Sequence, residues 1–121
     1  MNLKRVRIAV EPLLQTHARW KKALGGKSAS KRAVITVASW EVLGKALSPL
    51  RLEILARIPV LKPKSIAALA RDLKRDFKNV YADVMFLADL GLIELKEEGK
   101  RKRLIPIARF ARIEVDLGTA A

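Results

Sequence analysis

The sequence predicts an α+β fold that is mainly helical, with a short strand near each end of the chain. Three observations support this class. Apolar and charged residues alternate near both ends, which is the period of a half-exposed strand. In between, four Ser or Asp residues each precede a stretch with apolar residues at helical spacing, as N-capping residues do. After Gly91 the helical period gives way to two short runs around a Gly-containing turn, which indicates a β-hairpin.

Residues 1–32 are predicted to form a basic extension, joined to a domain over residues 33–121. Apolar residues alternate with others from Val6 to Val10, as in a strand. Glu11-Pro12 then opens an amphipathic helix, because Pro suits the first helical turn. Gly25-Gly26 ends that helix, and the basic segment that follows is typical of a flexible linker.

The first part of the main domain is predicted to contain a strand and the start of two helices. Ala33 to Val37 is rich in β-branched residues and favours a strand. Ser39 can cap a helix that reaches Leu47, with Trp40 on its inward face. Ser48-Pro49 is a second start signal, because it places a cap before a Pro at the first helical position.

The helix that starts at Pro49 has Ile54 and Ile58 on its apolar side. Because Pro is disfavoured inside a helix, we expect Pro59 and Pro63 to bracket the loop that follows. This loop leads to the next helix start at Ser65.

Two helices joined by a tight turn are predicted over residues 65–90. Ser65 caps the first helix, Lys74-Arg75 forms the turn, and Asp76 caps the second with its carboxylate directed at backbone amides. Gly91 stands where a left-handed residue ends the second helix. Four apolar residues cluster within about one third of the circumference of that second helix and are predicted to be core: Phe77, Val80, Val84 and Leu87.

The hairpin after Gly91 has Gly99 in its turn, and Pro106 either confines its second strand to an edge or ends its pairing there. A helix-turn-helix unit followed by a β-ribbon is the plan of the winged helix-turn-helix domain. In that plan the second helix enters the major groove of DNA, and the hairpin lies beside the phosphate backbone. The alternating strands at the two ends fit pairing with each other, or with the strands of a second subunit.

The charge balance narrows the function classes. The chain has 25 Lys and Arg against 12 Asp and Glu, a net charge of +13, which favours a polyanionic partner. It has no Cys and one His, so disulfides, thiolate metal sites and multi-histidine zinc sites are excluded, and we predict no cofactor. We find no catalytic constellation and predict that the chain is not an enzyme. The start of the chain lacks an apolar signal region and no stretch is long enough for a membrane helix, which predicts a cytoplasmic protein.

The predicted DNA-binding residues lie at the helix pair and at the hairpin turn. Lys64 and Ser65 place a cation at a helix N-terminus, where a phosphate can dock. Four polar or aromatic side chains near the start of the second helix can reach base edges, since Asn pairs with adenine and Arg or Lys with guanine: Arg75, Lys78, Asn79 and Tyr81. Four contiguous cations in the hairpin suit phosphate oxygens or the minor groove: Lys100, Arg101, Lys102 and Arg103.

Three bulky apolar residues admit two interpretations. Met85 and Phe86 point towards the outer side of the second helix, where they form either a protein-binding surface or, if the helix turns differently, part of the core. Trp20 is expected in the core, or else, beside Lys21 and Lys22, to stack on a base or to fill a groove of a partner.

Residues 34–117 resemble a family of small prokaryotic winged-helix predicted transcriptional regulators with a MarR-like DNA-binding part. The most telling segments are residues 48–52 (SPLRL), 65–70 (SIAALA) and 75–80 (RDFKNV). The resemblance implies homodimeric, operator-binding repression. Some members are antitoxins, which implies a cognate toxin as an alternative partner.

The chain departs from this family at several positions. Lys74 stands where the family usually has Gly, and Ala82 stands where it often has an Arg that contacts DNA. Members also commonly have polar residues near Met85 and Phe86.

Three functions therefore follow in order of preference. The first is a sequence-specific regulator of double-stranded DNA, acting as a homodimer and most simply as a repressor. The second is an antitoxin that neutralises a toxin protein and autoregulates its operon. The third is an RNA-binding module, which ranks last because single-strand readers present aromatic side chains and the six aromatics here fall mostly on predicted core faces.

Overall fold

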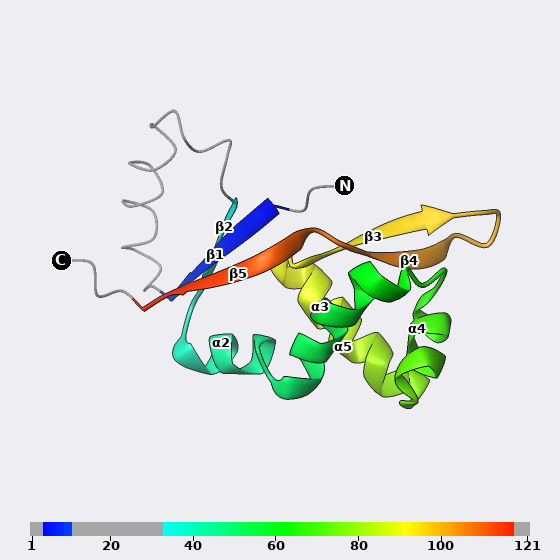
Figure 1. Cartoon of the computed structure of the whole chain (residues 1–121), viewed down its shortest axis with the longest axis horizontal. Coiled ribbons are helices and arrows are strands. Elements are labelled where there is room, and N and C mark those ends of the chain that lie inside the picture. Colours follow the sequence, from blue (N-terminus) through cyan, green and yellow to red (C-terminus); the bar gives the residue numbers. More distant parts are fainter. Residues whose placement is uncertain (1–3, 11–32, 118–121) are drawn as a thin grey trace. The chain divides into compact units, whose positions relative to one another are not determined.

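The computed structural model describes residues 4–10 and 33–117, and within them the chain is α+β as predicted (Figure 1). The elements divide into two compact units. One holds the first two strands, the last strand and the chain up to Lys45, and the other is residues 46–109. The sequence placed a division after residue 32 instead. The helix and linker predicted over residues 11–32 lie outside the described residues.

The first unit is built on a parallel sheet with the strand order β2-β1-β5. β1 (Lys4–Val10) is central and pairs with β2 (Ala33–Val37) and with β5 (Phe110–Asp116). The two alternating strands of the sequence therefore pair within one chain. Their alternation separates two faces, since Val6 and Ile8 are buried on one.

The other face of this sheet carries charge. The register sets Arg7 beside Glu114, and the Arg7 Nε donates to Glu114 Oε1 at 3.1 Å. Both side chains are more than one third exposed, so this ion pair contributes little to stability.

α2 (Trp40–Ala46) starts where the sequence placed it. The Ser39 hydroxyl accepts from the Val42 N–H at 3.2 Å, and Leu43 is buried. The inward position predicted for Trp40 is wrong, because its side chain is 54% exposed. A helical side chain covers the turn that precedes it, and the first residue of a helix has no preceding turn to cover.

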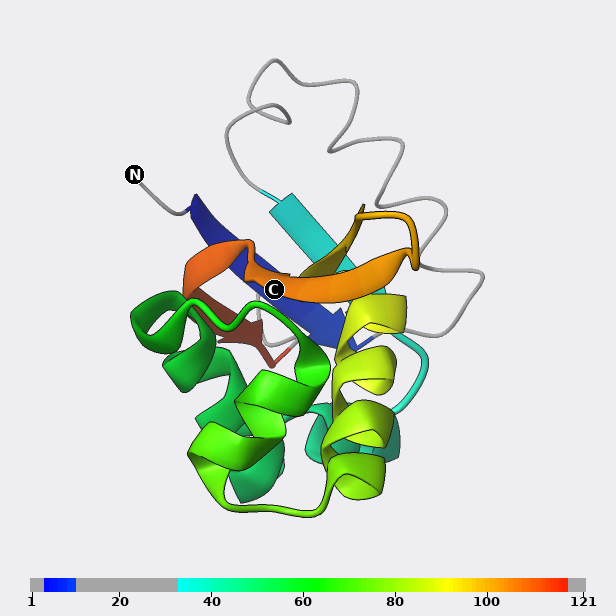
Figure 2. The same cartoon turned by 90° about the vertical axis from the view of Figure 1, so that its right-hand side faces the viewer.

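The second unit contains three helices and a two-stranded antiparallel sheet (Figures 1 and 2). The helices are α3 (Pro49–Leu61), α4 (Ile66–Leu73) and α5 (Phe77–Leu90). The sheet pairs β3 (Ile93–Glu98) with β4 (Arg103–Ala108). Each helix contributes a large, fully buried apolar side chain to one core: Ile54 from α3, Leu69 from α4 and Leu87 from α5. Leu92, which follows α5, is buried as well.

The start of α3 is as predicted, but its end is not. Ser48 Oγ accepts from the Arg51 N–H at 3.4 Å, the predicted cap. Pro59 lies inside the helix rather than in a loop. Pro59 lacks a backbone N–H and so removes one donor close to the C-terminal end of α3. The hydrogen bond that closes the helix, from the Lys62 N–H to the Ile58 carbonyl at 2.8 Å, is still made.

Candidate nucleic-acid interface

α4 and α5 are joined by a three-residue turn, residues 74–76, as the sequence predicts. Ser65 Oγ caps α4 by accepting from the Ala68 N–H at 3.0 Å. Lys74 ends α4 in the left-handed conformation, with φ of 57°, at the position where the similar family usually has Gly. The left-handed region is costly for a residue with a side chain, so Lys74 holds a position that Gly would occupy with less strain.

Asp76 begins α5 but does not cap it with its side chain. Its backbone is extended, as expected of an N-cap, and its carbonyl accepts from the Val80 N–H at 3.1 Å. Its carboxylate makes no capping hydrogen bond, so the predicted orientation towards the backbone amides is wrong. The side chain is exposed instead.

The two faces of α5 differ sharply in exposure. Val80 and Val84 are fully buried against the rest of the unit. Lys78, Asn79 and Ala82 are exposed. The first half of α5 therefore presents a cation and a carboxamide to solvent on a rigid helix.

Phe77 is not a core residue, contrary to the prediction. It is 49% exposed and lies beside Tyr81, which is 40% exposed, with a distance of 5.7 Å between the ring centroids. The physical reason is the same as for Trp40, since Phe77 is the first residue of its helix. The N-terminal end of α5, where Lys78 is exposed, consequently carries two exposed aromatic rings.

Arg75 is held inside the unit by a carboxylate that the sequence analysis did not single out. Its NH2 donates to Asp83 Oδ2 at 2.9 Å, and Arg51 Nε donates to Asp83 Oδ1 at 3.2 Å. The three side chains are 14–21% exposed. We therefore exclude Arg75 from the candidate DNA-contacting residues. Asp83 lies next to the buried Val84 in the sequence. An acid beside a core position is the signal that could have indicated a buried ion pair with a basic side chain.

Phe86 belongs to the same cluster. It is half-buried, and the Arg51 guanidinium lies over its ring at 4.2 Å from the centroid, a cation–π contact. Met85 is half-buried as well. These positions favour the packing interpretation of both residues over a protein-binding one. Trp20, the third residue of that group, lies outside the described residues.

The hairpin turn carries the densest run of cations in the described part of the chain. The run consists of four exposed residues, of which the first three are in the turn and the last begins β4: Lys100, Arg101, Lys102 and Arg103. The Lys102 N–H closes the turn on the Gly99 carbonyl at 3.1 Å, with Lys102 itself left-handed at φ 52°.

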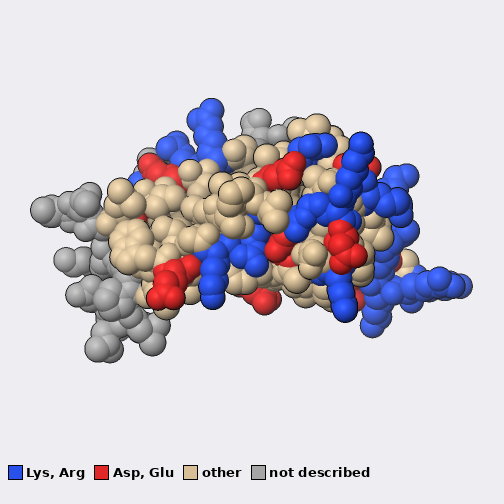
Figure 3. All heavy atoms as spheres, turned by 90° about the horizontal axis from the view of Figure 1, so that it is seen from below, with Lys and Arg blue, Asp and Glu red and all other residues tan. Residues whose placement is uncertain are grey.

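The hairpin turn and the start of α5 lie on the same side of the second unit, the side that faces the viewer in Figure 2, with the turn at the top and the start of α5 at the bottom. α5 and β3 run in opposite directions, so the hairpin returns towards the side where α4 lies (Figure 1). Blue side chains gather on that side, which is at the right in Figure 3. Lys64 is exposed and directly precedes the cap of α4. The second unit therefore combines the exposed start of a helix and a cationic loop on one side.

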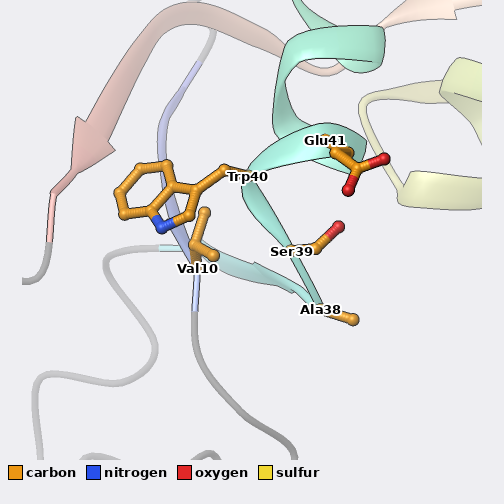
Figure 4. Close-up of a pocket in the computed structure, with 5 residues that line it drawn as sticks. All are labelled: Val10, Ala38, Ser39, Trp40 and Glu41. Atoms are coloured by element: carbon orange, nitrogen blue, oxygen red, sulfur yellow. The ribbon is translucent and has the colours of Figure 1, made fainter.

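The first unit has a shallow pocket that lacks comparable chemistry. It is lined by Val10, Ala38, Ser39, Trp40 and Glu41. In Figure 4 the Trp40 indole lies beside Val10, whereas Ser39 and Glu41 point to the other side. One carboxylate and one hydroxyl beside apolar side chains form neither an anion site nor a catalytic group.

Two further findings concern the described residues alone. No group of three His, Cys, Asp or Glu side chains in residues 4–10 and 33–117 is placed to hold a metal ion. No helix within these ranges is long and apolar enough to cross a membrane.

The described residues thus define a small basic α+β protein with a cationic surface at one end of its second unit. The HVO_A0114 family model matches residues 46–115, more than half of the chain, so the protein belongs to the HVO_A0114 family, which has no assigned function. The match spans the whole second unit and continues through β5 to Val115. A comparison with curated proteins gave no match.

Proposed function

We propose that the protein is a winged-helix regulator that binds double-stranded DNA with sequence specificity, as a homodimer and most simply as a repressor. One observation carries the proposal: the exposed first half of α5 and the cationic hairpin turn lie on the same side of one compact unit (Figure 2). In the winged-helix plan, the first of these elements enters the major groove and the second contacts the backbone beside it.

The hairpin turn would supply affinity rather than specificity. Its four cations can neutralise phosphates, and this releases counterions irrespective of sequence. Lys64, at the start of α4, adds a cation where the N–H groups of a helix also favour a phosphate. Binding through these groups should weaken steeply with salt, with a log-log slope of about −0.9 for each neutralised phosphate.

Specificity would come from α5. Asn79 can bond bidentately to adenine, and Lys78 can donate to guanine. Tyr81 and Phe77 offer apolar edges that can contact the methyl group of thymine. The exposed Ala82, where the similar family often has Arg, is a small residue that leaves room for close approach but provides no polar contact.

The test is a selection of duplexes from a random library, followed by competition binding. Asn79→Ala should lower the discrimination between the selected duplex and a scrambled one by about 1–3 kcal/mol. Arg101→Ala should weaken binding to both duplexes equally, and Arg112→Ala, an exposed cation of the first unit, should leave both unchanged. If the full chain failed to bind any duplex at low ionic strength, the proposed function would be wrong.

A single-stranded nucleic acid is a second candidate, because the structure exposes Phe77, which the sequence assigned to the core, beside the exposed Tyr81. Phe77 and Tyr81 are in contact with each other and next to Lys78, and exposed rings on a basic surface can stack on unpaired bases. Binding of a duplex, its separated strands and a structured RNA at matched salt separates the two candidates. Tighter binding of the single strands, lost in Phe77→Ala, would favour this one.

The antitoxin alternative has less support. It requires a docking surface for a toxin, and the residues proposed for that surface are either half-buried, as Phe86 is, or outside the described residues. Co-purification of a small toxic protein encoded beside the gene, at a defined stoichiometry, would support it.

A further inference from the structure

α3 has two apolar sides, and only one of them packs inside the second unit. Ile54 and Ile58 are buried. On the opposite side, Leu52 is 43% exposed and Val60 is 75% exposed, with the exposed Ala56 between them. At 100° per residue these three positions, four residues apart, form one stripe along the helix. A helix that is apolar on both sides is normally covered on both sides.

An ion pair borders this stripe along one flank. Arg57 NH1 lies 3.8 Å from Glu53 Oε2, and both side chains are more than two fifths exposed. On the helical wheel, Glu53 and Arg57 stand about 60° and 100° from Ala56, on the same side of it. An acid thus precedes the middle of the stripe, and a base follows it.

We propose that the stripe formed by Leu52, Ala56 and Val60 is the surface on which a second copy of the chain docks, with the two α3 helices antiparallel. This inference rests on the homodimer in the proposed function. Leu52 and Val60 are each four residues from Ala56, so a two-fold axis at Ala56 sets Leu52 of each copy against the partner's Val60. The contact is self-complementary, as a two-fold interface must be. The small Ala56 lets the helices approach closely at the axis.

The flanking charges select the antiparallel arrangement and a copy of the same chain. A two-fold axis perpendicular to the helices brings the same flank of each helix together, so Glu53 of each copy lies near the partner's Arg57. This pairing occurs twice. A parallel arrangement brings opposite flanks together and forms no such pair. One helix pair is smaller than the standard interface of about 1,600 Å², so we expect a dissociation constant on the order of 10 µM.

Charge complementation between two variants tests the proposal. In sedimentation equilibrium of the full chain, Glu53→Arg and Arg57→Glu should each weaken self-association at least tenfold. An equimolar mixture of the two should recover it as a heterodimer, because each introduced charge then faces an opposite one. Both variants break the pair within the helix equally, so recovery cannot come from that pair. Failure of the mixture to associate would overturn the arrangement.

The apolar stripe has a matched control on the same helix. Leu50 is 51% exposed but lies outside the stripe. Val60→Glu should abolish dimers that Leu50→Glu leaves unchanged. A dimer that persists in Val60→Glu would overturn this surface and leave the homodimer standing. A wild-type chain that stays monomeric throughout the micromolar range would overturn both the surface and the homodimer, and binding to DNA is then judged by its own assay.

Discussion

Asp83→Ala tests whether the Asp83 carboxylate of α5 holds α3 and the α4–α5 turn against that helix. Asp83 accepts hydrogen bonds from Arg51 at 3.2 Å and from Arg75 at 2.9 Å, and the three side chains are 14–21% exposed. Arg75 also has a second guanidinium nitrogen, NH1, that is buried without a hydrogen-bond partner in the structure. Removal of the carboxylate leaves the Arg75 guanidinium without its counterion in a largely buried position.

The magnitude follows from burial. Loss of one partner from a fully buried ion pair costs about 3–5 kcal/mol, and a hydrogen bond to a charged group contributes about 1.5–3 kcal/mol. The remaining solvent access lowers the cost, so we expect Asp83→Ala to reduce the free energy of unfolding by about 3 kcal/mol. Asp89→Ala, which removes an exposed acid from the same helix, should change it by less than about 0.5 kcal/mol.

Urea denaturation followed by circular dichroism measures both variants. The relevant quantity is the difference between them, because it removes effects common to any change of charge on α5. If Asp83→Ala lowered the free energy of unfolding no more than Asp89→Ala does, the hydrogen bonds of Asp83 with Arg51 and Arg75 would not stabilise the fold. The reasoning from burial would then be refuted.

Three other perturbations give distinct outcomes. Lys74→Gly should raise the free energy of unfolding by about 1 kcal/mol, because Gly occupies the left-handed region without strain. Lys74→Ala, which removes the charge but keeps the β-carbon, should give no such gain in the same denaturation assay. Leu69→Ala should lower the free energy of unfolding by about 2–5 kcal/mol, since Leu69 is fully buried, and a thermal melt that matched the wild type would contradict the assigned core. Replacement of Lys100, Arg101 and Lys102 by Ala should reduce the log-log salt slope of duplex binding by up to about 2.7, and an unchanged slope would exclude the hairpin turn from the interface.

The sequence predicted the features that depend on local signals. The caps at Ser48 and Ser65, the left-handed Gly91 and the hairpin around Gly99 all lie where it placed them. Each of these depends on a few neighbouring residues whose backbone preferences are strong. The exposure of Lys78 and Asn79 on α5 was likewise predictable, because the helical period places both away from the core.

The wrong predictions have a common cause at the ends of helices. Trp40 and Phe77 were assigned to the core by spacing, but each is the first residue of its helix, where spacing does not fix what the side chain covers. The prediction that Pro59 lies in a loop rests on the free-energy cost of Pro in the middle of a helix. Pro59 instead lies near the end of α3.

Features that join distant parts of the chain could not be read from local patterns. The parallel pairing of β1 with β5 connects strands about 100 residues apart, and the sequence left open whether they meet in one chain or between two. The contacts of Asp83 with Arg51 and Arg75 depend on how α3 packs on α5. Local patterns do not show that Asp83 holds Arg75, and for this reason the sequence predicted Arg75 as a DNA contact.

The position of residues 46–109 between β2 and β5 has a consequence for assembly on the ribosome. Because synthesis proceeds from the N-terminus, this stretch emerges whole before the strand that completes the parallel sheet. It can form its three helices and its hairpin while β1 still lacks one neighbour. Among the described strands we therefore expect β5 to be added last, alongside β1 with Val115 opposite Ile8, after residues 46–109 have been synthesised.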